Sequence, residues 1–214
     1  MLDPTRELLD SFYRGDPQPG IDNRLHALDP ATKVSREQGE LLAALHAKIR
    51  PAVSIEVGMA YGYSTLFIAD AMHEHGYGQH FAIDPFQRDH WKGIALAAVD
   101  RLHFGHRVRH VNDYSLPALV RMHEQGVRAD YVFIDGLHTF DGAFVDFVCA
   151  DRLLNVGGVI ILDDMWMPSI RKVASFIASN LAHYQVLETP VKNVFCVMKK
   201  ADDRRSWDHF VDFA

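Results

Sequence analysis

The most constraining feature of the chain is a strand, turn and helix pattern around position 60. An apolar run, Val53–Val57, meets the turn Gly58-Met59-Ala60-Tyr61-Gly62, and a helical pattern begins at Tyr63. Gly58 and Gly62 have no Cβ, so the backbone can turn sharply and approach a ligand closely. The first amides of a helix have no partner inside it, and they offer hydrogen-bond donors to a ligand. The pattern therefore predicts a ligand-binding turn in an α/β fold.

A carboxylate follows the second predicted strand. This strand ends at Asp84, 28 residues after Glu56. In open α/β sheets, an acid at the tip of the second strand binds ribose hydroxyls. A glycine-rich turn without a ligand is the alternative, but it leaves the position of Asp84 unexplained. We therefore expect a ligand with an adenosine-like ribose.

The spacing of the glycines narrows the type of ligand. Dinucleotide-binding turns have the pattern G-x-G-x-x-G, whereas this turn reads E-x-G-x-x-x-G-x-S-T from Glu56 to Thr65. The missing glycine makes the turn less suited to a diphosphate and disfavours an NAD-linked dehydrogenase. The spacing favours a sulfonium or thioether linker, with the amino-acid end of the ligand over the glycines.

Composition is typical of one globular domain. The chain has 214 residues, of which 48% are apolar and 23% charged. Its net charge of −6, without a basic run, argues against nucleic-acid binding. We expect a cytoplasmic protein that does not bind membranes, because neither a bilayer-length apolar run nor a secretion signal is visible. Cys149 and Cys196 lie in apolar stretches and are predicted to be free thiols.

Strand-like runs alternate with helical patterns from Val53 onward, which is typical of a parallel sheet covered by helices. Only Pro190–Asn193 separates the last two runs, and this is too short for a parallel return, so they must form an antiparallel hairpin. The sequence predicts an α/β fold: a Rossmann-like seven-stranded, mostly parallel sheet with a terminal antiparallel hairpin and helices on both faces. The expected strands are 53–57, 80–84, 108–112, 131–135, 159–163, 184–189 and 194–199, and the expected helices are 64–73, 91–104, 116–124, 140–154 and 169–181.

Three motifs resemble a known family: Glu56-Val57-Gly58 with Gly62-Tyr63-Ser64, Phe133–His138, and Gly157–Asp164. Over residues 34–199 the chain resembles class I S-adenosylmethionine-dependent methyltransferases. It is similar to the small cation-dependent O-methyltransferases of the catechol type and to the bacterial macrocin-type sugar O-methyltransferases. The resemblance implies transfer of a methyl group from S-adenosylmethionine to a hydroxyl of a small molecule.

The resemblance also implies roles for residues of the donor site. Glu56 and Gly58 would face the methionine part of the cofactor, and Ser64 would lie near its carboxylate. Asp84 would bind the ribose, and Tyr63 would border the cofactor unless it is a core residue. The implied cofactor-binding set is Glu56, Gly58, Gly62, Tyr63, Ser64, Asp84, Asp113, Tyr114 and Asp135, with Asp113 and Tyr114 beside the adenine.

Three carboxylates form a predicted metal site. In the sheet order of this class, Asp135 and the pair Asp163-Asp164 end neighbouring strands. Crowded carboxylates repel one another unless a cation offsets them, and oxygen ligands suit Mg²⁺, with Mn²⁺ or Ca²⁺ as substitutes. Capping of the next turn is the alternative role for Asp163 or Asp164.

His138 is the predicted general base, acting with Asp135. Its ordinary pKa near 6.5 would let a neutral imidazole accept a hydroxyl proton. Catechol-type enzymes have a lysine at this place, and an asparagine where this chain has Asp164. Trp166 is predicted to lie over the metal and contact the acceptor together with His138. A surface histidine and an apolar loop are the alternatives.

Residues 1–36 form a predicted N-terminal lid or arm, 37–200 the methyltransferase domain and 201–214 a C-terminal tail. The prolines and glycines of the first segment are expected to limit regular helix, which favours a mobile lid over the acceptor. A disordered tail, or an arm packed on a second subunit of a homo-oligomer, is the alternative. Beyond position 34, Ser35 and Gln38 predict a capping box that opens a helix.

Two other functions remain open on this sequence. Some hydroxylases resemble this family, and an Asp/His cluster can hold iron. A nucleotide-binding protein without turnover would share the fold, but it would have no need of clustered carboxylates.

Overall fold

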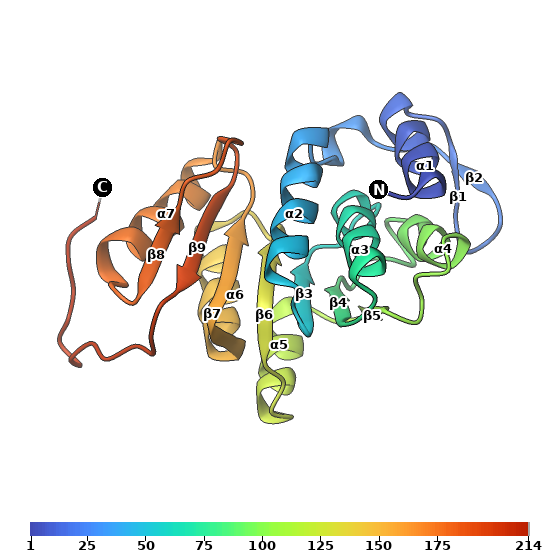
Figure 1. Ribbon diagram of the computed structural model, residues 1–214. Helices are drawn as coiled ribbons and strands as arrows, with labels where there is room; N and C mark the ends of the chain where they lie inside the picture. The colour runs from blue at the N-terminus through green and yellow to red at the C-terminus, as the bar shows by residue number, and fades with distance from the viewer. Residues whose placement is uncertain (214) are drawn as a thin grey trace. The chain divides into compact units, whose positions relative to one another are not determined.

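The computed structural model describes residues 1–213. The chain divides into two compact units, Met1–Tyr114 and Ser115–Ala214, and each is described by itself. The first unit contains three parallel strands and the helices that connect them (Figure 1). Its elements are α1 (Asp3–Arg14), β1 (Gln18–Pro19), β2 (Leu25–His26), a 3-10 helix (Pro30–Thr32), α2 (Arg36–Ile49), β3 (Val53–Val57), α3 (Tyr63–His75), β4 (Gln79–Ile83), α4 (Ile94–Arg101) and β5 (Val108–Val111).

The N-terminal segment contains a regular helix, α1, contrary to expectation. Its proline lies in the first turn, where no backbone N–H is needed, and the helix ends at Gly15 with a left-handed φ of 78°. Leu9 and Phe12 are fully buried on one face of α1. The Tyr63 hydroxyl on α3 donates a hydrogen bond to the Phe12 carbonyl over 3.0 Å. The prediction of little regular helix is therefore wrong for Asp3–Arg14, while the lid role stays a prediction.

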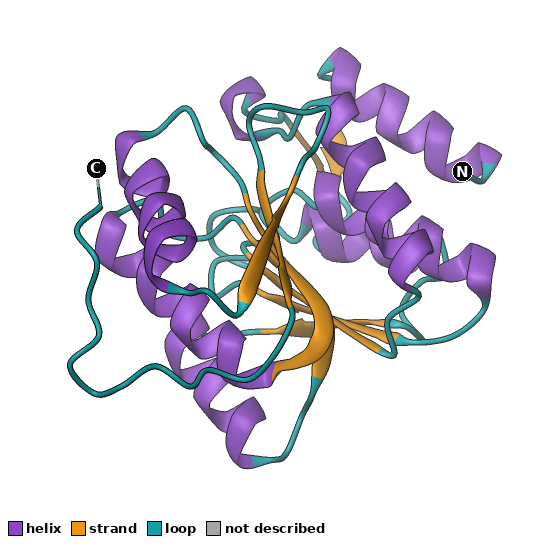
Figure 2. Cartoon of the chain, turned by 60° about the vertical axis from the view of Figure 1, so that its left-hand side comes forward, coloured by secondary structure: helices purple, strands orange, loops and turns teal. Residues whose placement is uncertain are grey.

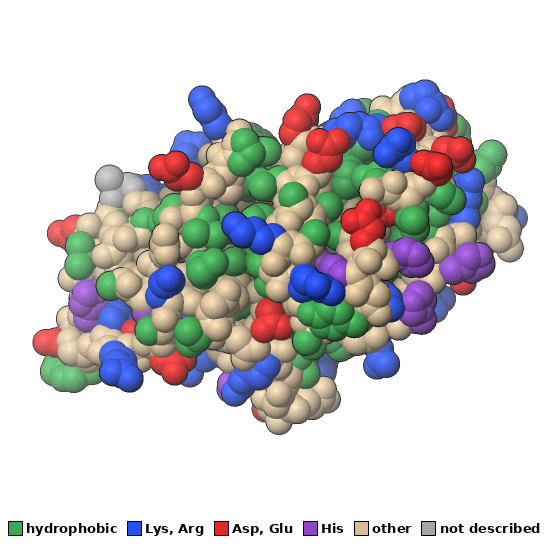
Figure 3. Space-filling view, in the orientation of Figure 1, with side chains coloured by type: hydrophobic (Ala, Val, Ile, Leu, Met, Phe, Trp, Pro, Cys, Tyr) green, Lys and Arg blue, Asp and Glu red, His purple; other side chains and the backbone are tan. Residues whose placement is uncertain are grey.

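The second half of the first unit follows the predicted pattern. The predicted capping box at α2 is present: the Gln38 amide donates to the Ser35 side chain, and the Ser35 amide donates to the Gln38 side chain. Buried β3 pairs in parallel with β4, and β4 pairs in parallel with β5. On the surface of this unit, histidine side chains gather in the region of α3 and α4 (Figure 3).

The second unit combines a parallel strand pair with a C-terminal hairpin. Strand β9 is antiparallel to both of its neighbours, so it is the reversed strand that the short loop predicts. Helices lie against these strands (Figure 2). The elements are α5 (Ser115–Glu124), β6 (Ala129–Ile134), α6 (Phe140–Leu153), β7 (Leu154–Leu162), α7 (Pro168–Asn180), β8 (Tyr184–Leu187) and β9 (Phe195–Lys199).

The main sheet has seven strands in the order β5-β4-β3-β6-β7-β9-β8. The predicted fold class, a Rossmann-like mostly parallel sheet with a terminal antiparallel hairpin and helices around it, is confirmed. Cys149 and Cys196 are both free thiols, as predicted. Within the described residues, no helix combines the length and the apolar character needed to cross a membrane.

Candidate functional site

The turn between β3 and α3 has the backbone shape that its glycines allow. Gly58 and Gly62 both have a φ of 90°, in the region that side chains disfavour. A Cβ on Gly62 would lie 2.9 Å from the Ala95 Cβ, so a larger residue would also clash. Ala60 has a left-handed φ of 44°, which is strained for a residue with a Cβ. The turn is therefore a constrained structure that leaves the first amides of α3 open.

Asp84 holds this turn from the end of β4. Its Oδ2 accepts hydrogen bonds from the amides of Met59 (3.2 Å) and Ala60 (2.8 Å) and from the Gln87 Nε2 (3.2 Å), and its Oδ1 accepts from the Phe86 amide (2.7 Å). Asp84 is only 4% exposed. A carboxylate has about four lone-pair positions, so its capacity for a ribose hydroxyl is small. The structure gives Asp84 a structural role that the sequence did not reveal, and its ribose contact stays a prediction.

Two polar groups beside the turn were missed by the sequence reasoning. Gln87 is fully buried, and its Nε2 donates to the Ala60 carbonyl over 2.6 Å. The Gln87 Oε1 and the Trp91 Nε1 are buried without a partner among the described residues. The Trp91 ring packs against Tyr61 of the turn, with 5.0 Å between centroids. Buried polar atoms are normally paired, so these atoms suit polar groups of a ligand. The only sequence signal is their place after the second strand.

Glu56 and the start of α3 fit the predicted cofactor contacts in part. Glu56 is fully buried; its Oε2 accepts a hydrogen bond from the Thr65 hydroxyl (2.5 Å) and lies 3.2 Å from the His80 Nε2. Its Oε1 has no hydrogen-bond partner among the described residues, which suits a residue facing a ligand's ammonium group. Ser64 lies in the first turn of α3. The Tyr63 side chain, in contrast, packs against Phe12 in the core. Its ring therefore fits the alternative that Tyr63 is a core residue.

The predicted adenine contacts lie just after β5. The Asp113 Oδ1 accepts a hydrogen bond from the Tyr114 amide over 2.7 Å. Tyr114 is 62% exposed and meets the exposed ring of Phe86 edge-on, with 5.8 Å between centroids. Phe86 follows Asp84 by two residues and was not predicted. Two exposed rings at neighbouring strand ends offer apolar faces to a planar base.

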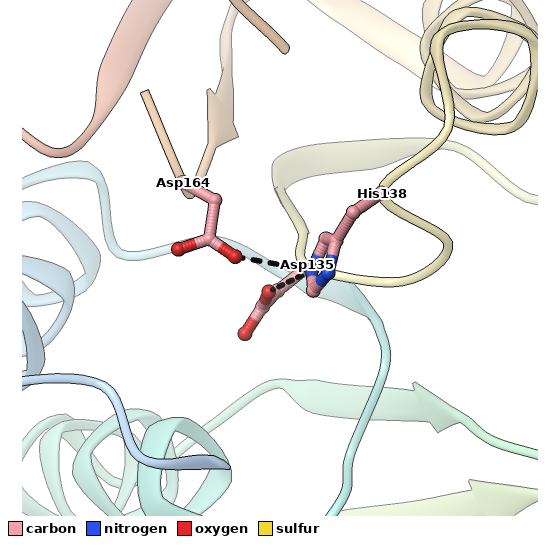
Figure 4. A group of neighbouring side chains, drawn as sticks. All are labelled: Asp135, His138 and Asp164. Carbon is pink, nitrogen blue, oxygen red and sulfur yellow. Dashed lines mark hydrogen bonds and ion pairs between the residues drawn. The ribbon is translucent and has the colours of Figure 1, made fainter. Parts of the chain in front are cut away.

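The second unit gathers Asp135, His138 and Asp164, whose side chains point toward one another (Figure 4). The His138 Nε2 lies 3.1 Å from the Asp135 Oδ1 and 3.2 Å from the Asp164 Oδ2. One ligand atom from each of the three residues lies within 4.8 Å of the others. Asp164 has a left-handed φ of 58°, a conformation that aspartate tolerates better than most residues. The turn after β7 thus directs its carboxylate toward the loop after β6.

Asp163 falls outside this group of converging ligand atoms. It is 4% exposed, and its Oδ1 accepts from the Asp164 amide (2.7 Å) and from the Asn193 Nδ2 (3.1 Å). Burial, with the nearby charge of Asp135, raises the pKa of Asp163 to about 8. Asn193 lies in the loop between β8 and β9, and no motif marked it in the sequence. Two of the three predicted metal ligands therefore come together, and His138 takes the place expected for Asp163.

His138 and Trp166 both contact the carboxylates directly. The hydrogen bond to Asp135 raises the pKa of His138, and the charges of Asp164 and Asp163 add to the effect. The Trp166 indole Nε1 donates to the Asp164 Oδ1 over 2.8 Å, while the side chain stays exposed. Trp166 thus orients Asp164 and still presents ring surface to solvent, while its contact with an acceptor stays a prediction.

Comparisons with known proteins define the class. The model of a family described as "Methyltransferase domain" matches residues 55–165, more than half of the chain. The chain belongs to this methyltransferase family. A search of curated protein sequences found no significant match.

Solved structures share the fold at low identity. The SAH-bound methyltransferase PaMTH1 of Podospora anserina has a TM-score of 0.70 at 17% identity, covering 94% of this chain and 89% of its own. An O-methyltransferase of Bacillus cereus in complex with SAH has a TM-score of 0.70 at 21% identity, covering 93% and 92%. The O-methyltransferase TomG of Streptomyces achromogenes, in complex with SAM, has a TM-score of 0.69 at 19% identity, covering 94% and 91%. Family and fold together confirm a class I S-adenosylmethionine-dependent methyltransferase.

Proposed function

We propose that the protein transfers a methyl group from S-adenosylmethionine to a hydroxyl of a small molecule, with the aid of a divalent metal ion. The main observation behind this proposal is that two carboxylates and an imidazole converge in the loops after β6 and β7. The O-methyltransferases of similar fold, two of them bound to SAM or SAH, support the donor and the reaction. A hydroxyl acceptor needs both alignment and loss of its proton, and the cluster supplies groups for both.

The donor would bind at the turn of the first unit. The Oε1 of Glu56, unpaired in the part of the chain that the structure describes, would accept from the ammonium group of the methionine part. The open amides at the start of α3 would receive its carboxylate. The Gln87 Oε1 and the Trp91 Nε1 would pair with polar groups of the nucleoside. Asp84 would act chiefly by holding Met59 and Ala60 in place.

The cluster of the second unit fits a divalent ion. Asp135 and Asp164 are partly exposed, so their oxygens are accessible, and the group offers two oxygens and one nitrogen. Imidazole suits Mn²⁺, Fe²⁺ or Zn²⁺ better than Mg²⁺, so the donor set shifts the expected metal away from Mg²⁺. When bound, the ion would lower the pKa of the acceptor hydroxyl and fix its position.

His138 has two predicted roles that compete for one atom. Its Nε2 faces both carboxylates, so it either joins them as a metal ligand or stays protonated as their counter-ion. As a metal ligand through Nε2, it could not take the acceptor proton at the same atom. A neutral His138 would then serve as the base only when the ion binds the two carboxylates without it.

The imidazole also supports the second candidate, a metal-dependent hydroxylase on the same fold. Non-haem iron sites combine histidine and carboxylate ligands, as this cluster does. Metal analysis of the purified protein separates the two functions. Iron with no methyl transfer would favour the hydroxylase, whereas activity restored by Mn²⁺ or Mg²⁺ after chelation would favour the methyltransferase.

Calorimetry and a methyl-transfer assay test the proposal. We expect micromolar binding of S-adenosylhomocysteine and no comparable binding of NAD. We also expect labelled methyl transfer to members of a panel of catechols, sugars and polyols, lost in chelator and restored by a divalent ion. Tighter binding of NAD would overturn the donor assignment, and full activity after exhaustive chelation would reduce the cluster to an ion pair.

A further inference from the structure

A continuous line of polar side chains lies in the interior of the first unit, beyond the proposed donor contacts. Glu56, His80, Ser54 and His46 are all fully buried, and they come from β3, β4 and α2. The line ends at His75 on α3, which is half-buried. Burying this many polar groups is costly unless each is satisfied, so the arrangement calls for an explanation.

Each neighbour in this line lies within hydrogen-bond reach of the next. The His80 Nε2 lies 3.2 Å from the Glu56 Oε2, and the His80 Nδ1 lies 2.9 Å from the Ser54 Oγ. The His46 Nε2 lies 3.3 Å from the same Oγ, and the His46 Nδ1 lies 3.3 Å from the His75 Nε2. His80 and His46 each contact their two neighbours through different ring nitrogens, whereas Ser54 contacts both of its neighbours through its single Oγ.

A Ser-His-Glu sequence of contacts is known from hydrolytic sites, but that use is excluded here. The Ser54 hydroxyl lies between the rings of His80 and His46, both fully buried, and this position closes it to a substrate. The line must act through one of its ends. Glu56 at one end is the residue proposed to face the ammonium group of the methyl donor.

The hydrogen bonds along this line can run in either of two directions, and each direction gives one consistent order of donors and acceptors. With Glu56 ionised, His80 donates to it from Nε2, and Ser54, His46 and His75 then donate in the same direction along the line. With Glu56 protonated, every donor is reversed, and each histidine carries its proton on Nδ1 instead. The second order holds one proton more than the first. This extra proton sits on the His75 Nδ1, a buried atom that has no partner within residues 1–213.

We propose that this line is a proton chain whose order of donors sets the charge that Glu56 presents to the methyl donor. The chain makes His80, Ser54 and His46 positioning residues for the donor site. This inference rests on the proposed function. Ammonium binding favours the order in which Glu56 is ionised, so the donor and the proton at His75 oppose each other through linkage.

The surroundings disfavour a charge on His46 and on His75. Burial lowers the pKa of His46 to about 3, with help from His80 and His75. Burial and then the charges of Arg50 and Arg107 lower the pKa of His75, and Glu74 opposes them.

The partners at the two ends complete this picture. Beside the chain, Glu56 receives a hydrogen bond from Thr65 on α3. The ring of Tyr77 packs against His75, with 5.2 Å between centroids. Burial, which lowers the pKa of His46, disfavours a charge at that ring inside the line.

Nitrogen NMR of the histidine rings tests the chain itself, without any activity. At pH 8 we expect His75, His46 and His80 to be neutral with the proton on Nε2, assigned with single His→Gln variants. On acidification the three rings should change tautomer together. Opposite tautomers on His46 and His80, or an imidazolium on either at pH 8, would overturn the proposal.

Binding of S-adenosylhomocysteine tests the link to the donor site. His80→Gln can still donate to Glu56 and should bind within about threefold of wild type at pH 8, whereas His80→Phe should bind at least about tenfold more weakly. In His46→Phe, ligand addition should no longer shift the His75 signals. His73→Gln, an exposed change on the same helix, is the matched control.

The outcomes separate the two proposals. Wild-type protein that does not bind the ligand defeats the proposed function, while the ring tautomers still report on the chain. If the wild-type protein binds the ligand and His80→Phe binds it with the same affinity, the proposed proton chain is wrong. If His80→Phe does not fold, His80→Gln and the wild-type tautomers decide.

Discussion

Asp84 and Asp164 both follow a buried strand, yet the two units use them differently. Asp84 is buried and accepts hydrogen bonds from three backbone amides and one side-chain amide, all neutral donors. Asp164 remains partly exposed and shares the His138 imidazole with Asp135. Fixed neutral donors satisfy a charge permanently, whereas a titratable imidazole can be exchanged for a metal ion. The first arrangement builds a rigid turn, and the second a site that can change its occupant.

The largest expected effect separates the two arrangements by activity, through variants of Asp135 in the cluster and of Asp84 in the turn. Asp135→Asn should lower metal-dependent methyl transfer by at least about 100-fold, because it removes a charged ligand. S-adenosylhomocysteine affinity should change much less. Asp84→Asn should do the opposite, weakening S-adenosylhomocysteine about ten- to hundredfold because the turn loses a charged acceptor. Calorimetry and initial rates measure both, and equal effects of the two variants on binding would contradict the division of roles.

The second prediction concerns the packing beneath the donor turn. Leu9→Ala in α1 should cost about 2–4 kcal/mol of unfolding free energy, because it removes a fully buried side chain. Leu25→Ala is the matched control, since Leu25 is 70% exposed and should change stability by less than about 0.5 kcal/mol. Denaturant titration measures both. A loss below about 1 kcal/mol for Leu9→Ala would show that α1 is a loosely attached arm.

The third prediction uses Asp163, the buried carboxyl next to the cluster of Asp135, His138 and Asp164. The pKa of Asp163 is raised to about 8 in the folded chain, so its neutral form is favoured there. Stability contributed by the neutral form is present in acid and is lost as the pH rises toward about 8. In chelator at pH 8, Asp163→Asn should therefore stabilise the protein by an amount on the order of 2 kcal/mol.

This gain should shrink toward zero at pH 4. Asp202→Asn, at an exposed position, should show neither the gain nor its pH dependence. Thermal unfolding at the two pH values gives the comparison. Destabilisation by Asp163→Asn at pH 8 would mean that the ionised carboxylate is held by a partner, as a metal ligand would be.

The smallest expected effect tests the rigidity of the turn. Ala60 has a left-handed φ of 44°, so Ala60→Gly should raise the unfolding free energy by about 0.5–1 kcal/mol through relief of strain. Ala31→Gly, outside the turn, serves as the control. A loss of stability in Ala60→Gly would mean that the surrounding hydrogen bonds already remove the strain.

The fold was readable from the sequence because its signals are local. Apolar runs mark β3, β4, β6 and β7, and the short loop before β9 leaves only an antiparallel return. The helix α1 was not expected, because counting prolines and glycines ignores their positions. One proline of the segment falls in the first turn of the helix, and the others follow Gly15, beyond its end.

The candidate site was only partly readable, because hydrogen bonding decides roles that residue types leave open. The sequence pointed to Asp135 and Asp164 but could not show that His138 joins them while Asp163 turns into the interior. Gln87 and Asn193 lie in loops and have no motif, so only the folded backbone shows what they contact. The buried histidines looked like ordinary members of a histidine-rich chain.

The left-handed backbone at Asp164 limits what evolution can place there, before any question of chemistry. Glycine, asparagine and aspartate accept such a φ at lower cost than most residues. Of these, only the latter two carry an oxygen that can reach a metal ion. The catechol-type enzymes have asparagine at this place and this chain has aspartate, so the two alternatives differ by one unit of charge. Exchanging aspartate for asparagine here would change the charge of the proposed site by one unit, and with it the ions that the site would prefer.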